Sequence, residues 1–165
     1  MKHANHGGAI VEFTIVLPLL LTLLLGTMHF GYIFYVYNVL EKSVRDGARY
    51  ASMRTYGAAC AGQFITDVRN TVAFGVQTGQ STPVVPAGNP AFAAAANVDV
   101  KCSFDGTLPA TATCSTTTNV PPVAVTVRIV SFNVPGTFNT VTLNGKPRAT
   151  FPYLGRFIPP SIPCN

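Results

Sequence analysis

Residues 6–53 read HGGAIVEFTIVLPLLLTLLLGTMHFGYIFYVYNVLEKSVRDGARYASM, and this stretch decides the fold. A carboxylate stands at Glu12, and residues 13–40 then contain no Asp, Glu, Lys or Arg. A helix needs about 20 apolar residues to cross a bilayer core of about 30 Å. The uncharged stretch exceeds that length, and the remaining chain is too small and polar to bury it. The sequence therefore predicts a transmembrane helix with its membrane segment at about residues 13–40.

This segment differs from a cleaved secretory signal. Such a signal has an apolar core of about 7 to 15 residues and a small-residue cleavage site after it. Here the apolar run is longer, residues 26–31 read GTMHFG, and helical spacing continues beyond them. We therefore expect a single long helix over residues 8–56, retained as an anchor or trimmed only at its front end.

The second part of this helix is predicted to be amphipathic. Small and apolar residues recur there at spacings of three and four: Val36, Val39, Leu40, Val44, Gly47, Ala48 and Ala51. This stripe packs either on a neighbouring subunit or on the protein's own C-terminal domain. The second alternative is favoured for residues 44–51.

Residues 57–165 are predicted to form a small α+β domain. Helical spacing over residues 64–74 ends at Gly75. A loop rich in Gly, Pro, Ser and Ala follows to residue 96. Alternating apolar and polar residues then predict strands at 98–104 and 123–129.

Turn signals connect the predicted strands. Asp105-Gly106 leads into a Thr-rich partner strand within residues 111–118, and a change of apolar phase at Val130 predicts a bulge or bend. Asn144-Gly145 is the strongest hairpin signal, joining residues 139–143 to residues 149–153. The predicted fold class is thus α+β, a long helix packed on a small, mainly antiparallel sheet.

The cysteines all follow the anchor, at Cys60, Cys102, Cys114 and Cys164. An even number favours disulfides in an oxidising compartment, whereas the basic residues after the anchor favour a cytoplasmic side. Cys102 and Cys114 bracket the first predicted hairpin, where a bridge would contribute about 3 kcal/mol. Cys60 would then pair with Cys164, although three connectivities are possible. We expect the C-terminal domain to lie outside the cytoplasm.

Several classes of function find no support in the sequence. The net charge of +5 comes from dispersed basic residues, so no nucleic-acid partner is expected. No C-x-x-C pair exists and no histidine follows His29, so neither a metal nor another cofactor is predicted. The chain also lacks the common nucleophile, metalloprotease and P-loop motifs. We therefore expect that the protein is not an enzyme.

The front end of the helix carries an unusual carboxylate. A charge at Glu12, where the helix enters the membrane, is costly without a partner. Cleavage between Gly7 and Gly8 would create an amine four residues before that carboxylate, and the pair would offset part of the cost. Alternatively, Glu12 simply lies at the level of the lipid headgroups.

The same residues carry a family resemblance. A short basic leader, Gly7 before the cut, Glu12 at the fifth mature position and an aromatic at Phe13 resemble the class III signal of type IV pilin-like proteins. The Tad-type signal more often has Tyr where Phe13 stands. The segments VEF at 11–13, HFGYIFY at 29–35 and RDGARYAS at 45–52, with the Leu-rich run between the first two, resemble the N-terminal region of TadE-like pseudopilins.

The resemblance implies a pilin-like minor pilin of the Tad (tight adherence, Flp) type IVc pilus. Residues 1–7 would be a leader removed by prepilin peptidase, and Glu12 with Phe13 would form the assembly position. Implied partners are the major pilin, other minor pilins, the peptidase, the inner-membrane assembly platform and inner-membrane lipid. Implied roles are initiating or capping a filament for adhesion, biofilm formation or secretion. The alternative is an uncleaved, single-pass, membrane-anchored periplasmic binding module.

Overall fold

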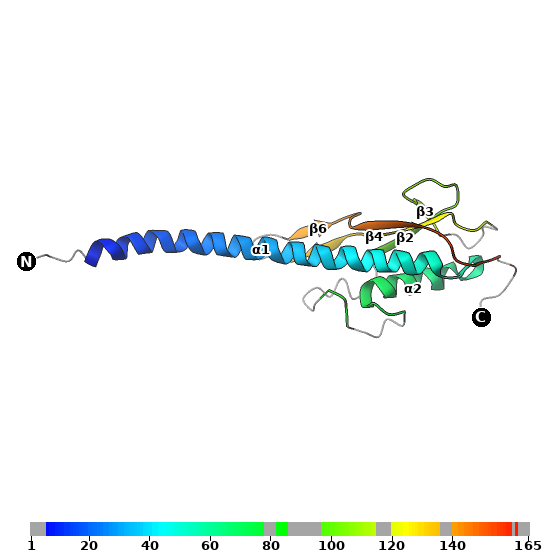
Figure 1. Ribbon diagram of the computed structural model, residues 1–165, viewed down its shortest axis with the longest axis horizontal. Coiled ribbons are helices and arrows are strands. Elements are labelled where there is room, and N and C mark those ends of the chain that lie inside the picture. Colours follow the sequence, from blue (N-terminus) through cyan, green and yellow to red (C-terminus); the bar gives the residue numbers. More distant parts are fainter. Residues whose placement is uncertain are drawn as a thin grey trace, which may run out of the picture. The chain divides into compact units, whose positions relative to one another are not determined.

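A computed structural model describes residues 6–77, 82–85, 97–114, 120–135, 140–159 and 161. Two compact units divide the chain, Met1–Tyr35 and Val36–Asn165, and one helix contributes to both (Figure 1). The elements in order are α1 (His6–Met53), β1 (Tyr56–Gly57), η1 (Ala58–Cys60), α2 (Ala61–Phe74), β2 (Val98–Ser103), β3 (Ala112–Thr113), β4 (Ala124–Ile129), β5 (Phe132–Val134), β6 (Val141–Leu143), β7 (Arg148–Pro152) and β8 (Phe157–Ile158). The predicted α+β class is confirmed.

The first unit consists of the N-terminal part of α1. Residues 10–25 are all exposed, although most of them are large and apolar. The helix runs through Pro18 without interruption. It ends at Met53, three residues before the predicted boundary, because the chain turns extended to form β1.

The C-terminal part of α1 supplies the core of the second unit. Val36, Leu40, Val44 and Ala48 are fully buried there. A methyl group added at Gly47 would overlap Cγ2 of Val72 in α2, so the two helices approach closely at that glycine. In Figure 1, α2 and the strands lie alongside this part of α1. The stripe therefore packs on the protein's own domain, as favoured for residues 44–51.

The second helix matches its prediction closely. Phe64, Val68 and Val72 are buried on one face of α2. The helix ends where Gly75 adopts a left-handed conformation with φ of 72°, and its N–H donates to the Thr71 carbonyl at 2.9 Å. Glycine adopts this conformation at no steric cost, which explains why the stop signal was readable.

The main sheet has the strand order β3-β2-β4-β7 and is antiparallel throughout. The predicted strands at 98–104 and 123–129 are confirmed as β2 and β4. However, β4 is buried on both faces: besides its apolar side chains, Thr126 is only 1% exposed. The segment before β3 covers this face, since the Ala110 N–H donates to Thr126 Oγ1 at 2.9 Å. The alternation of apolar and polar residues in β4 did not predict that another segment would cover its polar face.

The hairpin predicted at Asn144-Gly145 is wrong. β6 pairs with β5 in a separate two-stranded sheet, whereas β7 pairs with β4. Gly145 has a φ of 78°, but its N–H donates to the Ile129 carbonyl at 2.8 Å instead of closing a β6–β7 turn. Pairing with distant strands thus outweighs the local turn preference.

The predicted bend near Val130 is confirmed, and the predicted Thr-rich strand is confirmed in part. The phase change predicted at Val130 is a bend, because Ser131 takes a φ of 52° and β5 begins a separate sheet. The Thr-rich partner strand is confirmed only as β3, while residues 115–119 lie outside the described part of the chain. Of the predicted loop over 75–96, the described residues belong to no helix or strand.

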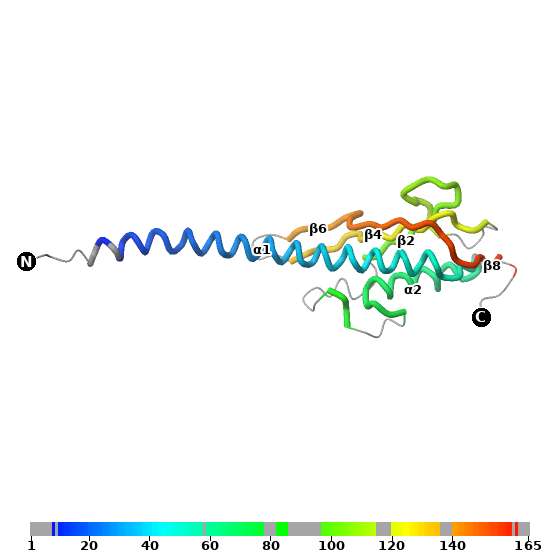
Figure 2. The backbone as a smooth tube through the Cα atoms, viewed as in Figure 1, coloured from blue at the N-terminus to red at the C-terminus, as the bar shows by residue number. Residues whose placement is uncertain are grey.

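The sequence did not reveal the pairing that closes the second unit. β1 and β8 form a parallel pair with Tyr56 opposite Phe157 and Gly57 opposite Ile158 (Figure 2). Each strand has two residues, too few to show a periodic pattern. This pair joins the chain just after α1 to its C-terminal segment.

Candidate functional site

The threonine hydroxyls in the exposed N-terminal part of α1 are satisfied within the helix. The hydroxyls of Thr14, Thr22 and Thr27 donate to carbonyls of Ile10, Leu19 and Leu24 within the same helix, at 2.7, 2.8 and 2.9 Å. Such bonds leave no hydroxyl hydrogen in need of water. Apart from Glu12, the surface that remains is mostly apolar, which suits lipid or the apolar helix of another protein.

The predicted processing residues lie in the first turns of this helix. Gly8 and Glu12 stand four residues apart, so they share one face of α1. Nothing lies within 4 Å of the position that a side chain at Gly8 would take. Glu12 and Phe13 are both exposed. Lys2 of the predicted leader lies outside the described residues.

Of the predicted disulfides, one is present in the described part of the chain. Cys102 and Cys114 are bonded with their Cα atoms 4.9 Å apart, and they join β2 to the chain just after β3. Cys60 is also disulfide-bonded. Its predicted partner Cys164 lies outside the described residues, so that pairing stays a prediction.

A tyrosine cluster that sequence reasoning missed fixes the end of α1. The Tyr153 hydroxyl lies 2.9 Å from the Arg54 carbonyl, 2.8 Å from the Arg156 carbonyl and 2.8 Å from the Tyr56 N–H, which donates to it. The buried Tyr56 ring packs edge-on against Phe64, with centroids 5.3 Å apart. Burial raises the pKa of the Tyr56 phenol to about 12 and also raises that of Tyr153.

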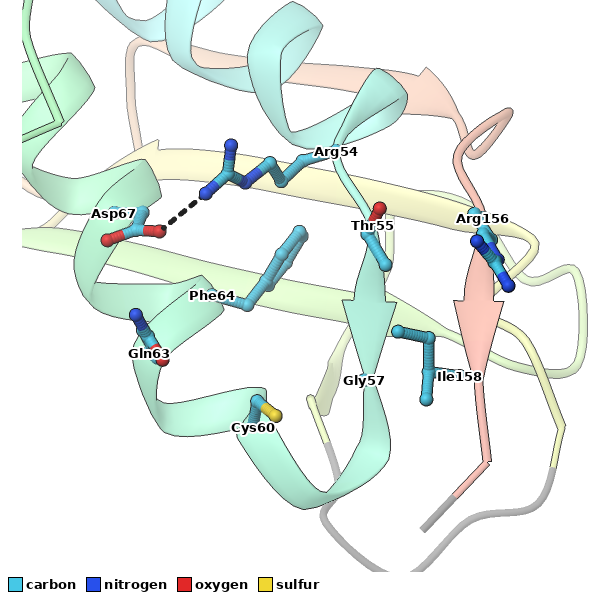
Figure 3. Close-up of a pocket in the computed structure, with 9 residues that line it drawn as sticks. All are labelled: Arg54, Thr55, Gly57, Cys60, Gln63, Phe64, Asp67, Arg156 and Ile158. Carbon is cyan, nitrogen blue, oxygen red and sulfur yellow. Dashed lines mark hydrogen bonds and ion pairs between the residues drawn. The ribbon is translucent and has the colours of Figure 1, made fainter. Parts of the chain in front are cut away.

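A pocket of about 310 Å³ opens beside this cluster (Figure 3). Phe64 and Ile158 supply apolar lining, and Arg54 reaches across to Asp67, with a nitrogen and an oxygen 3.5 Å apart. Arg156 lines the opposite side, and Figure 3 shows its side chain directed away from Asp67. The described lining residues include no histidine, and the one carboxylate among them, Asp67, is already paired with Arg54. The arrangement therefore provides polar contacts but no recognisable catalytic group.

Length and composition single out the first helix among the described residues. Only the stretch Ile10–Met53 of α1 is long and apolar enough to cross a membrane. Its most apolar part is wholly exposed within the protein. A buried core helix would show the opposite, because its apolar side chains would be covered.

Residues 7–49 match the family model for TadE-like protein. The N-terminal segment of this chain is TadE-like. The match begins at the predicted leader junction and reaches into the buried stripe, so it includes both the exposed anchor and the helix that supports the second unit. No curated protein and no solved structure matches the chain.

The TadE-like segment associates the protein with the Tad pilus, a structural assembly rather than a catalytic one. Its apolar helix is able to anchor the protein in a membrane. The TadE-like match also suggests association with other components of the pilus. The match ends at residue 49, so the role of the rest of the second unit must be argued from its own surface.

Proposed function

We propose that this protein is a minor pilin of a Tad pilus, processed by prepilin peptidase and helping to start or cap the filament. The observation that carries the proposal is the TadE-like match over residues 7–49, which includes the wholly exposed apolar part of α1. In this proposal the second unit lies outside the cytoplasm, where its disulfides would be stable. The filament would serve adhesion, biofilm formation or secretion.

The proposed mechanism concerns the helix during its transfer from lipid to filament. After cleavage at Gly7, the new amine of Gly8 would lie one turn from Glu12 on the same face. Moving charges into an apolar environment costs free energy. For two opposite charges this cost is smaller when they move as a pair than when each moves separately. Glu12 would meet either its own amine or that of an adjacent subunit. Partners in this step would be the major pilin, other minor pilins and the inner-membrane assembly platform.

The first experiment is to determine the N-terminus of the protein purified from its native membrane, by intact mass and peptide mapping. A chain that begins at Gly8 is expected. Gly7→Val should leave the leader attached, because a branched side chain would block the peptidase. Gly26→Val is the matched control, since that glycine has open space around it and lies away from the junction.

A second arm separates processing from assembly. Glu12→Gln should be cleaved normally yet enter filaments poorly, which is measured by its abundance in sheared pili relative to membranes. An intact Met1 in cells that contain the peptidase would reject pilin processing and favour an uncleaved, membrane-anchored binding protein. A start beyond residue 26 would reject both.

A further inference from the structure

The outer face of the main sheet carries a row of charges that is not balanced. The register places Asp99, Arg128 and Arg148 side by side on β2, β4 and β7. Both Nε and Nη2 of Arg128 donate to Asp99 Oδ2, at 2.8 and 2.7 Å, and Lys101 lies 3.8 Å from the same carboxylate. Arg148 stands directly opposite Arg128, an unfavourable position for a like charge. It is exposed and has no ion-pair partner in the described part of the chain.

A groove of about 540 Å³ adjoins Arg148 on the same face. Its lining includes Leu108, Pro109, Val123 and Pro152, and Arg148 is the one charged residue among the described lining residues. Leu108 is 65% exposed and Val123 is 51% exposed, so large apolar side chains face solvent here. Such a lining suits an apolar group that has a carboxylate beside it.

The free edge of β7 borders this groove. The Tyr153 N–H donates to the Val123 carbonyl and the Ile129 N–H to the Pro147 carbonyl, which fixes the alternation along β7. The main-chain groups of Arg148 and Thr150 therefore point away from β4. No strand among the described residues pairs with them. A free edge of this kind is able to accept an added strand.

We propose that the β7 edge and the adjoining groove dock an extended segment of a partner protein that carries an acidic residue between apolar residues. The edge would supply main-chain hydrogen bonds, the groove would take an apolar side chain, and Arg148 would pair with the carboxylate. A membrane surface would use only the charge, whereas the groove and the edge favour a peptide. This proposal rests on the second unit alone, so it is independent of leader processing and filament assembly.

The test uses the full chain in phosphatidylcholine nanodiscs and a fluorescent peptide, Val-Thr-Val-Thr-Glu-Thr-Val-Thr-Val, with binding measured by anisotropy. Its valines share a face with the Glu, because side chains two positions apart along a strand point the same way. The peptide with Gln in place of Glu should bind at least about tenfold more weakly, the usual loss for one charge-assisted hydrogen bond. Arg148→Gln should remove this preference by weakening only the Glu peptide. Lys146→Gln is the matched control, because it makes the same charge change at an exposed residue outside the groove.

A second peptide pair tests the strand itself. N-methylation of the amides on one edge of the peptide should abolish binding, and methylation on the other edge should not. Thr150→Pro removes an outward N–H and should weaken both peptides, with folding checked by circular dichroism. Equal losses in Arg148→Gln and Lys146→Gln, or no effect of methylation on either edge, would overturn strand docking. So would an absence of peptide binding together with Arg148-dependent contact to phosphatidylglycerol nanodiscs, which would instead assign the basic row to lipid.

Discussion

The Tyr153 hydroxyl shows how one side chain secures the junction after α1. It contacts the carbonyls of Arg54 and Arg156 and the N–H of Tyr56, three main-chain groups from two distant parts of the sequence. Gly155 lies in the same turn, and a methyl group there would overlap the Arg54 carbonyl. No motif in the sequence marks these residues, because their meaning depends on contacts between residues ninety-seven or more positions apart.

Tyr153→Phe is expected to lower the free energy of unfolding by about 1–2 kcal/mol, since it removes a hydroxyl that serves several main-chain groups. Urea unfolding followed by circular dichroism measures this. Tyr37→Phe makes the same chemical change at a partly exposed site on α1 and should shift stability by less than about 0.5 kcal/mol. Equal effects of the two substitutions would show that the hydroxyl contacts add nothing.

Stability should also depend on pH through Tyr56, whose N–H donates to the Tyr153 hydroxyl. Burial raises the pKa of Tyr56 from 10.0 to about 12, so the folded state favours the neutral phenol. That contribution is fully present below pH 10 and is lost as the pH rises toward 12. Denaturation midpoints should therefore fall across this window while absorbance at 295 nm reports phenolate formation. A midpoint that stays level while Tyr56 ionises would contradict the assignment.

At acid pH, the dependence of stability on pH has a different origin, the carboxyl group of Asp105. The hydroxyl and N–H of Thr107 and the hydroxyl of Ser103 lower the pKa of Asp105 from 3.8 to about 2. This contribution is present above pH 3.8 and is lost as the pH falls toward 2. Asp105→Asn should flatten the stability profile over that range, as measured by the same denaturation midpoints, and leave the alkaline limb unchanged.

Among the helices and strands, those with a clear local pattern were predictable. The apolar run of α1, the spacing in α2 with Gly75 after it, and the alternation in β2 and β4 are all set within one segment. The Asn144-Gly145 turn misled because two strands on either side of it found partners in different sheets. The burial of Thr126 was hidden because a segment before β3 covers it, and that cover has no periodicity.

The contact between α1 and α2 offers a direct test at Gly47. Alanine favours a helix more than glycine does, yet a methyl group at this position would overlap Val72. Gly47→Ala is therefore expected to destabilise by about 1–3 kcal/mol. Gly62→Ala in α2 meets open space and should be neutral or stabilising by up to about 1 kcal/mol. The melting temperatures of both variants test this prediction. A Gly47→Ala variant more stable than the original protein would contradict the close approach of α1 to α2 at this position.

Both units contain part of α1, and the second unit begins at Val36. From this boundary we predict which fragments of the chain fold independently. A fragment of residues 36–165 retains the buried stripe and should unfold cooperatively in urea. A fragment of residues 54–165 lacks Val36, Leu40, Val44, Ala48 and Ala51 and should show no cooperative transition. Cooperative unfolding of the shorter fragment would show that the helix is dispensable to the core.

For the candidate site, the sequence predicted the anchor, the family resemblance and the Cys102–Cys114 bond. These depend on composition and short spacings that a single sequence displays. The groove beside Arg148 was not predictable, because its lining comes from β4, β7 and the segment before β3, which only the sheet register brings together. Cleavage at Gly7 and the role of Glu12 stay predictions.

The parallel pairing of β1 with β8 has a consequence for biosynthesis. The ribosome produces α1 and its apolar stripe early, whereas Phe157 opposite Tyr56 emerges only near the end of the chain. Closing so long a loop is slow, so β1 stays unpaired until translation is nearly complete. The α2 helix is made soon after α1 and can cover the stripe near Gly47, whereas the rest of the stripe stays uncovered until the strands have been made. The nascent protein would therefore present an apolar helical surface during much of its translation. It would depend on chaperones or on prompt membrane insertion to avoid premature aggregation.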